Sequence, residues 1–244
     1  MTERNVKPAG DSARVAEGAN SWRTLFLVAG VASVGFVLLQ IAAITLDTVA
    51  PPAVEGGAET LDFIAANKAV YVAEQILWLL PNMLAVLAFV ALFVALAPTN
   101  RSLALIGAVV GGLSWASFLA IPVTSRGSLT LVYLSDRFTD AGADEAARQR
   151  FATAAEAILA ENNTPAVVGV LSATGILIIS LAMLRSVLPR WVGWLGVAAG
   201  VFGIAGEALR QAVPPFYLGY GLLMWAWFIA VGIALLRLGL RTPR

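Results

Sequence analysis

The chain has 244 residues, of which 59% are hydrophobic and only 13% are charged, and its mean hydropathy is +0.82. A soluble domain carries about 25% charged residues, so this composition indicates a polytopic membrane protein. The chain has no cysteine and no histidine, which excludes disulfides, thiolate metal sites, His-ligated zinc or haem and His-dependent triads. We expect no cofactor, no bound metal and no nucleic-acid partner.

Six apolar segments are long enough to cross a bilayer, since a spanning helix needs about 20 residues. They lie near residues 24–46, 70–97, 103–124, 165–184, 191–211 and 216–236. We therefore predict an all-α fold, a six-transmembrane-helix bundle that forms a single membrane domain over residues 21–240. Residues 1–20 are polar and have no apolar period, so we predict a mobile cytoplasmic tail there.

The charged residues between these segments predict the orientation of the chain. The two termini and the links that share their side carry ten basic residues: Arg4, Lys7, Arg14, Arg23, Arg101, Arg185, Arg190, Arg237, Arg241 and Arg244. Only three acidic residues lie on that side, and the other twelve lie on or near the opposite side. The positive-inside rule then predicts a protein of the cell membrane with both termini in the cytoplasm.

In the first span, small and polar residues share one face. Gly30, Ser33, Val37, Gln40 and Asp47 fall within an arc of about 100° at 3.6 residues per turn. Gln40 is the only amide of this span, and we expect the face that carries it to point into the bundle.

The second span carries a longer polar stripe. Its members fall within roughly 100° of arc: Asn67, Tyr71, Glu74, Gln75, Trp78, Asn82 and Ala85. Pro81 is expected to kink the helix beside them. The stripe is expected to face protein, either as hydrogen-bonding contacts between helices, worth about 0.6 kcal/mol each, or as the wall of a binding site.

The link between the third and fourth spans contains an amphipathic pattern. Apolar Ala147, Phe151, Ala155 and Ile158 recur at helical spacing among charged residues. This pattern predicts an amphipathic extracytoplasmic helix over about 143–161. The helix either connects the spans along the outer surface or acts as a gating lid.

The fifth span has the most regular face of the chain. Gly193, Gly196, Gly200 and Gly203 recur every three or four residues, and Glu207 and Arg210 continue the same stripe. Small residues on one stripe let a neighbouring helix approach closely. We therefore expect Glu207 to face protein, where it pairs with Arg210 or contributes to a site.

These faces combine into one candidate ligand-binding site. If the first, second and fifth spans meet, an outward-facing polar cavity is lined by Gln40, Asp47, Tyr71, Glu74, Gln75, Asn82, Glu207 and Arg210. A carboxylate inside an apolar span is unusual, because a charge at the bilayer centre costs about 2.5–3.5 kcal/mol.

The aromatic residues allow two interpretations. Trp22, Trp191 and Trp194 lie where an inner aromatic belt is expected, and Tyr217 and Tyr220 where an outer one is expected. The tryptophans within the spans either pack between helices or line an apolar ligand pocket: Trp78, Trp115, Trp225 and Trp227.

The segment from Leu184 to Gly196 reads LRSVLPRWVGWLG, and a long glycine-spaced helix follows it. It resembles a widespread group of bacterial multi-pass membrane proteins that carry a domain of unknown function. In that group a short basic loop, Pro-Arg-Trp and a Gly-rich helix join the fourth and fifth spans. The similarity in helix count and loop layout extends over most of residues 20–240. It implies a fold of six helices and supplies no activity or catalytic residues.

Three functions remain as hypotheses. In the first, the protein binds or translocates a small cationic or amphiphilic molecule, or a lipid, through the outward-facing cavity. In the second, it is an accessory or structural subunit that packs against a membrane-protein partner through its glycine-rich helix faces. In the third, it is a membrane enzyme whose paired carboxylates, or a carboxylate-held metal, replace histidine and cysteine. Its expected partners are the lipid bilayer and these candidate ligands or proteins.

Overall fold

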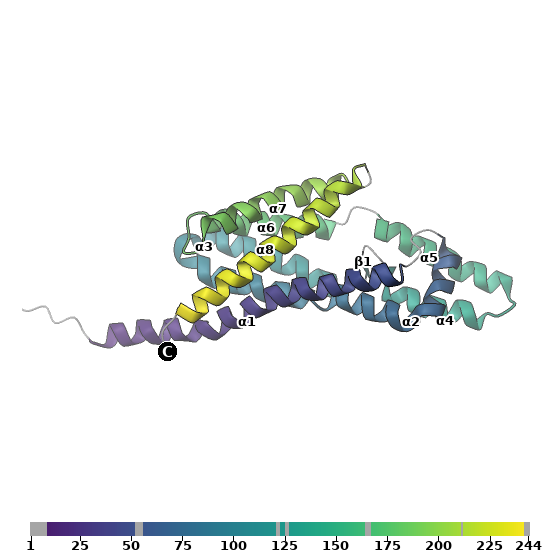
Figure 1. Cartoon of the computed structure of the whole chain (residues 1–244), viewed down its shortest axis with the longest axis horizontal. Helices are drawn as coiled ribbons and strands as arrows, with labels where there is room; N and C mark the ends of the chain where they lie inside the picture. The colour runs from purple at the N-terminus through teal and green to yellow at the C-terminus, as the bar shows by residue number, and fades with distance from the viewer. Residues whose placement is uncertain are drawn as a thin grey trace, which may run out of the picture.

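The computed structural model describes residues 9–51, 56–120, 123–124, 127–163, 167–210 and 212–241. Its helices are α1 (Ala9–Val49), α2 (Gly57–Leu79), α3 (Asn82–Ala120), α4 (Leu129–Asp140), α5 (Glu145–Asn163), α6 (Val167–Met183), α7 (Arg190–Ala208) and α8 (Pro214–Arg241) (Figure 1). Two short strands, β1 (Val123–Thr124) and β2 (Gly127–Ser128), pair antiparallel between α3 and α4. The fold is therefore almost entirely helical, as predicted. Helix α1 begins within the range expected to be a tail, of which residues 1–8 lie outside the described residues.

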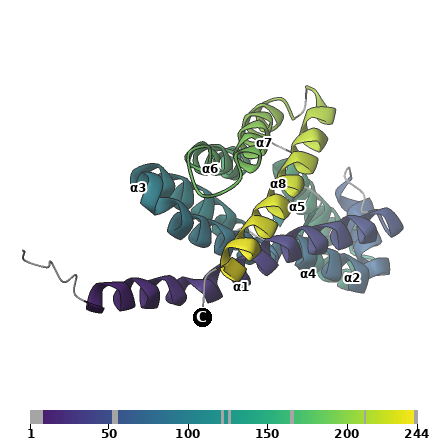
Figure 2. The same cartoon turned by 60° about the vertical axis from the view of Figure 1, so that its left-hand side comes forward.

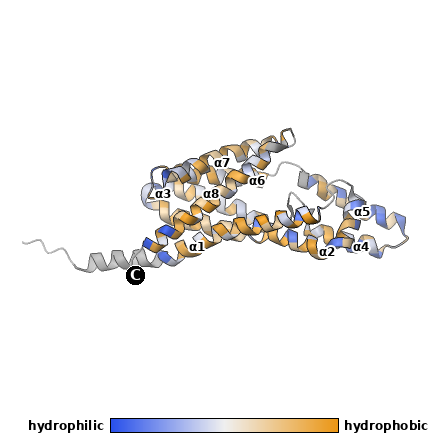
Figure 3. Ribbon diagram, viewed as in Figure 1, coloured by the Kyte–Doolittle hydropathy of each residue, from blue (hydrophilic) through white to orange (hydrophobic). Residues whose placement is uncertain are grey.

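Several helices are long and apolar enough to cross a membrane. The stretches that qualify are Trp22–Val49, Gly57–Ala120, Arg190–Ala208 and Phe216–Arg241, and Val167–Met183 is apolar but shorter. Large apolar side chains point outward, such as Val31 and Leu113, which are 64% and 65% exposed, while Ser33 and Gln40 are buried. Figure 3 shows the same separation, with apolar residues along the long helices and polar ones concentrated on α4 and α5. This inverted distribution fits a lipid surrounding.

The predicted span over 70–97 is wrong as a single helix. Helix α2 begins earlier, at Gly57, and ends at Leu79, and α3 starts at Asn82. The break falls at Pro81, which has no N–H to donate to the preceding turn. The predicted kink at Pro81 is therefore confirmed.

A second break divides α3 at Asn100. Asn100 has non-helical backbone angles (φ −152°, ψ 90°), and its side-chain Oδ1 accepts a hydrogen bond from Leu103 N at 3.0 Å. This contact caps the start of the next helical segment. The Phe89 ring on the first half lies against Gly111 on the second half, so the chain reverses its direction at Asn100.

Antiparallel neighbours pack closely at glycines. A methyl group added at Gly107 would lie 2.7 Å from Ile179 N, and one added at Gly200 would lie 2.8 Å from the Cα of Leu177. Gly111 and Gly175 face each other directly across α3 and α6. The prediction that the glycine stripe of α7 faces protein is confirmed, because its glycines contact α6 and α8 of the same chain.

These contacts define two ends of the bundle. Arg23 Nε donates to Gly239 O at 3.2 Å, which brings the start of the apolar part of α1 to the end of α8. The reversal within α3 and the loop between α6 and α7 lie at the same end (Figure 1). We call this the terminal end and the opposite one the distal end. Trp22, Trp191 and Trp194 are exposed near the terminal end.

The distal end carries a small helical cap. The predicted helix over 143–161 is present as α5, and its apolar face packs on α2 and α4 around a separate core: Leu61, Ile64, Tyr71, Leu131, Phe138, Ala152, Ala155 and Leu159. The Arg148 guanidinium lies 3.9 Å from the centroid of the Phe138 ring. Lys68 Nζ and Asp136 Oδ1 form an ion pair at 2.7 Å. Helix α4 and the first half of α2 lie in links that the sequence pattern left without a predicted element.

The glycine contacts predict opposite effects for two alanine substitutions. Gly175→Ala places a methyl group against the Gly111 backbone, where nothing can yield, so overpacking should cost about 1–3 kcal/mol of stability. Gly219→Ala meets no atom within 4 Å and should stabilise its helix by up to about 1 kcal/mol. Thermal unfolding in detergent measures both. Equal melting temperatures for the two variants would contradict the close packing of α3 on α6.

Candidate functional site

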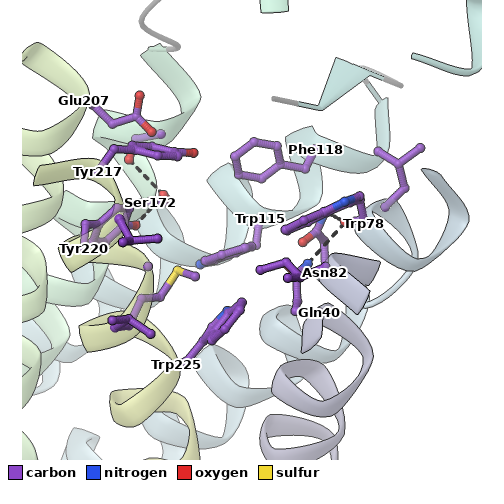
Figure 4. Close-up of a pocket in the computed structure, with 17 residues that line it drawn as sticks. Gln40, Trp78, Asn82, Trp115, Phe118, Ser172, Glu207, Tyr217, Tyr220 and Trp225 are labelled. Atoms are coloured by element: carbon purple, nitrogen blue, oxygen red, sulfur yellow. Dashed lines mark hydrogen bonds between the residues drawn. The ribbon is translucent and has the colours of Figure 1, made fainter. Parts of the chain in front are cut away.

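A cavity of about 470 Å³ lies between two groups of helices in the distal half of the bundle. Helices α1, α2 and α3 form one wall and α6, α7 and α8 form the other (Figure 4). The residues that line it are Gln40, Ile44, Trp78, Leu79, Asn82, Trp115, Phe118, Gly169, Ser172, Glu207, Tyr217, Leu218, Tyr220, Gly221, Leu222, Met224 and Trp225. The lining is mainly apolar and aromatic, with a few polar groups.

Two amides meet at the helix break on the first wall. Gln40 Nε2 and Asn82 Nδ2 both donate to the backbone carbonyl of Trp78, at 3.4 Å and 3.2 Å. Pro81 breaks the helix three residues after Trp78, and the side-chain amides supply donors at this break. The polar residues thereby fix α1 against the junction of α2 and α3.

The opposite wall carries a hydroxyl pair. Ser172 Oγ donates to Gly169 O at 2.8 Å and lies 3.4 Å from the Tyr220 hydroxyl. Because the single hydroxyl proton of Ser172 goes to Gly169, Tyr220 is the donor to Ser172. Tyr220 is only 4% exposed. The expectation that Tyr220 belongs to an interfacial belt is therefore wrong, since its ring packs inside the bundle.

Glu207 brings a carboxylate to the cavity. Its side chain is buried and lies directly over Gly169 of α6, where a side chain larger than hydrogen would collide with it. Glu207 Oε2 is 3.8 Å from Arg210 Nη1, so the expected pair is present, at a separation beyond hydrogen-bond length. The Arg210 guanidinium also lies over the Tyr217 ring, 4.5 Å from its centroid. Among the described residues, Glu207 is the only charged side chain that lines the cavity.

Aromatic rings close the inner part of the cavity. The Trp115 ring contacts Phe36 edge-on, with centroids 5.1 Å apart, and lies 5.6 Å from Phe118. The indole nitrogens of Trp115 and Trp225 are buried without a hydrogen-bond partner in the described part of the chain. Both residues line the cavity, so its inner end is bordered by indole rings.

Gln40, Asn82 and Glu207 of the predicted site line this cavity, and Arg210 adjoins it through Glu207. Helix α7 packs on α6 and α8. Glu207 therefore faces Gln40 and Asn82 across the cavity. The assumed direct meeting of the first, second and fifth spans is therefore replaced by two walls with a cavity between them.

The remaining predicted residues are buried outside the lining. Glu74 Oε1 accepts from Trp78 Nε1 at 3.2 Å, behind the ring that faces the cavity. The Tyr71 hydroxyl accepts from Ser128 N at 3.0 Å and donates to Ser128 O at 3.2 Å. A methyl group on Gly127 would lie 3.2 Å from Gln75 Nε2, and Asp47 is buried near the distal end of α1. Tyr71 thus holds the β1–β2 segment against α2, and Gln75 lies beside this contact.

Sequence reasoning missed part of the second wall. The sequence pattern gives no signal at Ser172, and it predicts Tyr217 and Tyr220 at the membrane surface. The alternative use of the tryptophans as pocket walls was the available signal, since Trp78, Trp115 and Trp225 line the cavity. Within the described ranges, no group of three or more acidic side chains is arranged to hold a metal ion.

The shared carbonyl predicts coupling between Gln40 and Asn82. Gln40→Leu or Asn82→Leu alone leaves the other amide donating to Trp78 O, so each should cost about 0.6 kcal/mol, an average interhelical contact. The double substitution removes both side-chain donors and should cost more than the sum of the two. A double-mutant cycle of unfolding free energies measures the coupling. Strictly additive losses of unfolding free energy would contradict the idea that either amide can satisfy the Trp78 carbonyl.

Comparisons with known proteins identify a family but no activity. The family model described as "Domain of unknown function (DUF4386)" matches residues 24–240, which is most of the chain. This match confirms the resemblance to a group defined by a domain of unknown function. No curated protein and no solved structure matches the chain.

Proposed function

The chain belongs to the DUF4386 family, whose description names no activity, and we propose a function from the composition of its cavity. The protein binds, or translocates, an amphiphilic molecule that carries a cationic group. The cationic group lies at Glu207 and the apolar part lies against the aromatic side chains deeper in the cavity. The lipid bilayer surrounds the site.

The single observation that carries this proposal is the composition of the cavity wall. Glu207 is the one charged group in the described lining, and the Tyr217 and Tyr220 rings lie beside it. A buried carboxylate attracts a cation strongly because the surrounding dielectric is low. The Tyr217 ring beside it already contacts one cation, the Arg210 guanidinium, 4.5 Å from its centroid. The remaining lining is mainly apolar, and about 470 Å³ lies within the usual 300–1,000 Å³ of ligand pockets.

We place the chain in the membrane with six crossings. These are α1, the helix that runs through α2 into the first half of α3, the second half of α3, α6, α7 and α8. The basic residues near the terminal end support a cytoplasmic location for both termini. The cap of α4 and α5 is then extracytoplasmic, and the cavity lies in the outer half of the bundle.

The other two hypotheses have less support. A subunit that docks through its glycine faces needs them free, yet Gly196, Gly200 and Gly203 of α7 contact α6 or α8. An enzyme with paired carboxylates needs two acids at one site. Glu74 accepts a hydrogen bond from Trp78 behind the cavity wall, whereas Glu207 lies on the opposite wall.

The proposed orientation predicts which surface residues a membrane-impermeant maleimide reaches. The chain has no cysteine, so single-cysteine variants report without background. Ala143→Cys lies in the exposed turn of the cap and should label in intact cells. Val187→Cys, 71% exposed in the loop between α6 and α7, should label only after the membrane is permeabilised. The reverse pattern would invert the topology.

Ligand binding predicts a charge-dependent stabilisation. Dodecylamine should raise the melting temperature of the purified protein more than dodecanol, which has the same chain without the charge. A ligand at a hundredfold excess over its Kd stabilises by about 2.7 kcal/mol. Glu207→Gln should abolish the preference for the amine, because it removes the charge that lines the cavity.

A matched pair of glycine variants tests the location. Gly221 lines the cavity and Gly219 does not, and neither would place a Cβ within 4 Å of another atom. Gly221→Phe should therefore fill the cavity and abolish stabilisation by dodecylamine, whereas Gly219→Phe should retain it. Amine-specific stabilisation that survives both Glu207→Gln and Gly221→Phe would refute the proposed site.

A further inference from the structure

Helices α1 and α8 cross closely near the terminal half of the bundle. A methyl group added at Gly30 would lie 2.9 Å from Gly232 O, and one added at Gly239 would lie 3.0 Å from the Leu27 side chain. These two contacts, with the bond from Arg23 to Gly239 O, fix the two helices together over their terminal halves.

Beyond this crossing the two helices separate. Gly221 of α8 shares a helix face with Gly232, and it would meet no atom within 4 Å if it carried a Cβ. Figures 1 and 2 show α8 leaving α1 at an angle, so that the distance between them widens toward the distal end. The cavity lies in this widening, because Gln40 and Ile44 of α1 and Leu218 and Leu222 of α8 all line it.

The α8 side of this gap faces both the cavity and the outside. Leu218 and Leu222 line the cavity and are also 69% and 58% exposed. On α1, the neighbouring Leu38 and Ile41 are exposed as well. The surface around the gap therefore carries large aliphatic side chains on helices apolar enough to cross a membrane. Acyl chains, rather than water, are the medium that such a surface contacts.

We propose that the gap between α1 and α8 is a lateral entrance, through which the acyl chain of a bilayer lipid with an ammonium headgroup enters the cavity. This inference rests on the proposed function and names its ligand class. An acyl chain that moves from the bilayer into an apolar cavity never contacts water. Its passage therefore exposes no apolar surface to water. The headgroup stays near Glu207, toward the distal end.

The positions of the cavity tryptophans set how far the acyl chain of the lipid reaches. Trp225 follows Leu218 by seven residues on α8, a distance of about 10 Å along the helix axis. Trp115 lies at the inner end of the same cavity and is only 5% exposed. Lipid around the outside of the bundle therefore has little access to Trp115, whereas an acyl chain inside the cavity contacts it.

Tryptophan fluorescence in nanodiscs tests the entrance. The protein is placed in phosphatidylcholine with either ordinary or dibrominated acyl chains, because bromine quenches indole emission on contact. The emission of one tryptophan is obtained by subtracting the fluorescence of the variant that lacks it from the fluorescence of the wild type. Trp115→Phe isolates the cavity residue. Trp227→Phe is the matched control, since Trp227 is fully buried and does not line the cavity.

We expect brominated chains to remove the emission of Trp115 and to leave that of Trp227 unchanged. Gly221→Phe should restore the Trp115 emission, and Gly219→Phe should not. Unquenched Trp115, or equal quenching of both tryptophans, would overturn the lateral entrance. If dodecylamine still stabilises the protein in that case, the proposed binding function stands and only the route is wrong. If dodecylamine also fails to stabilise it, both proposals are wrong.

Discussion

Close backbone contact at glycines is the interaction on which the rest of this structure depends. Between apolar helices in lipid, burial provides little net drive, so van der Waals packing must hold the helices together. Gly111 and Gly175 let α3 and α6 touch along their backbones, and Gly196 and Gly200 let α7 approach α6 and α8. The positions of these glycines therefore decide which helices are adjacent and at what distance.

The cavity forms where such contacts end. Gly30 and Gly232 bring α1 and α8 together in the terminal half, while Gly221, on the same face of α8, meets open space in the distal half. The volume left between the two walls is bordered by rigid rings instead of a neighbouring helix. The same helix angle that closes one end of the bundle therefore opens the other. The cavity is a property of the packing and needs no separate domain.

The buried polar residues have two different roles. Tyr71, Glu74 and Asn82 make hydrogen bonds that hold chain segments where a helix ends or a strand pair docks. Glu207 instead brings a charge to the cavity wall, with Arg210 near enough to offset part of the cost of burying it. A polar stripe on a helix looks the same in sequence in both cases, because both kinds must face protein and not lipid.

The residues alone predict the helical class, most of the apolar segments, the break at Pro81 and the protein-facing glycine stripe of α7. These follow from local chemistry: segment length, a missing backbone N–H and the absence of a side chain. The sequence also identified Gln40, Asn82 and Glu207 as inward-facing. Their places on opposite walls of one cavity, which α6 and α8 complete, are visible only in the folded chain. The same is true of the separate cap that α2, α4 and α5 build. The reason is that periodicity gives the direction of a side chain around its own helix, whereas the partner it meets depends on helix crossings between residues far apart in the chain.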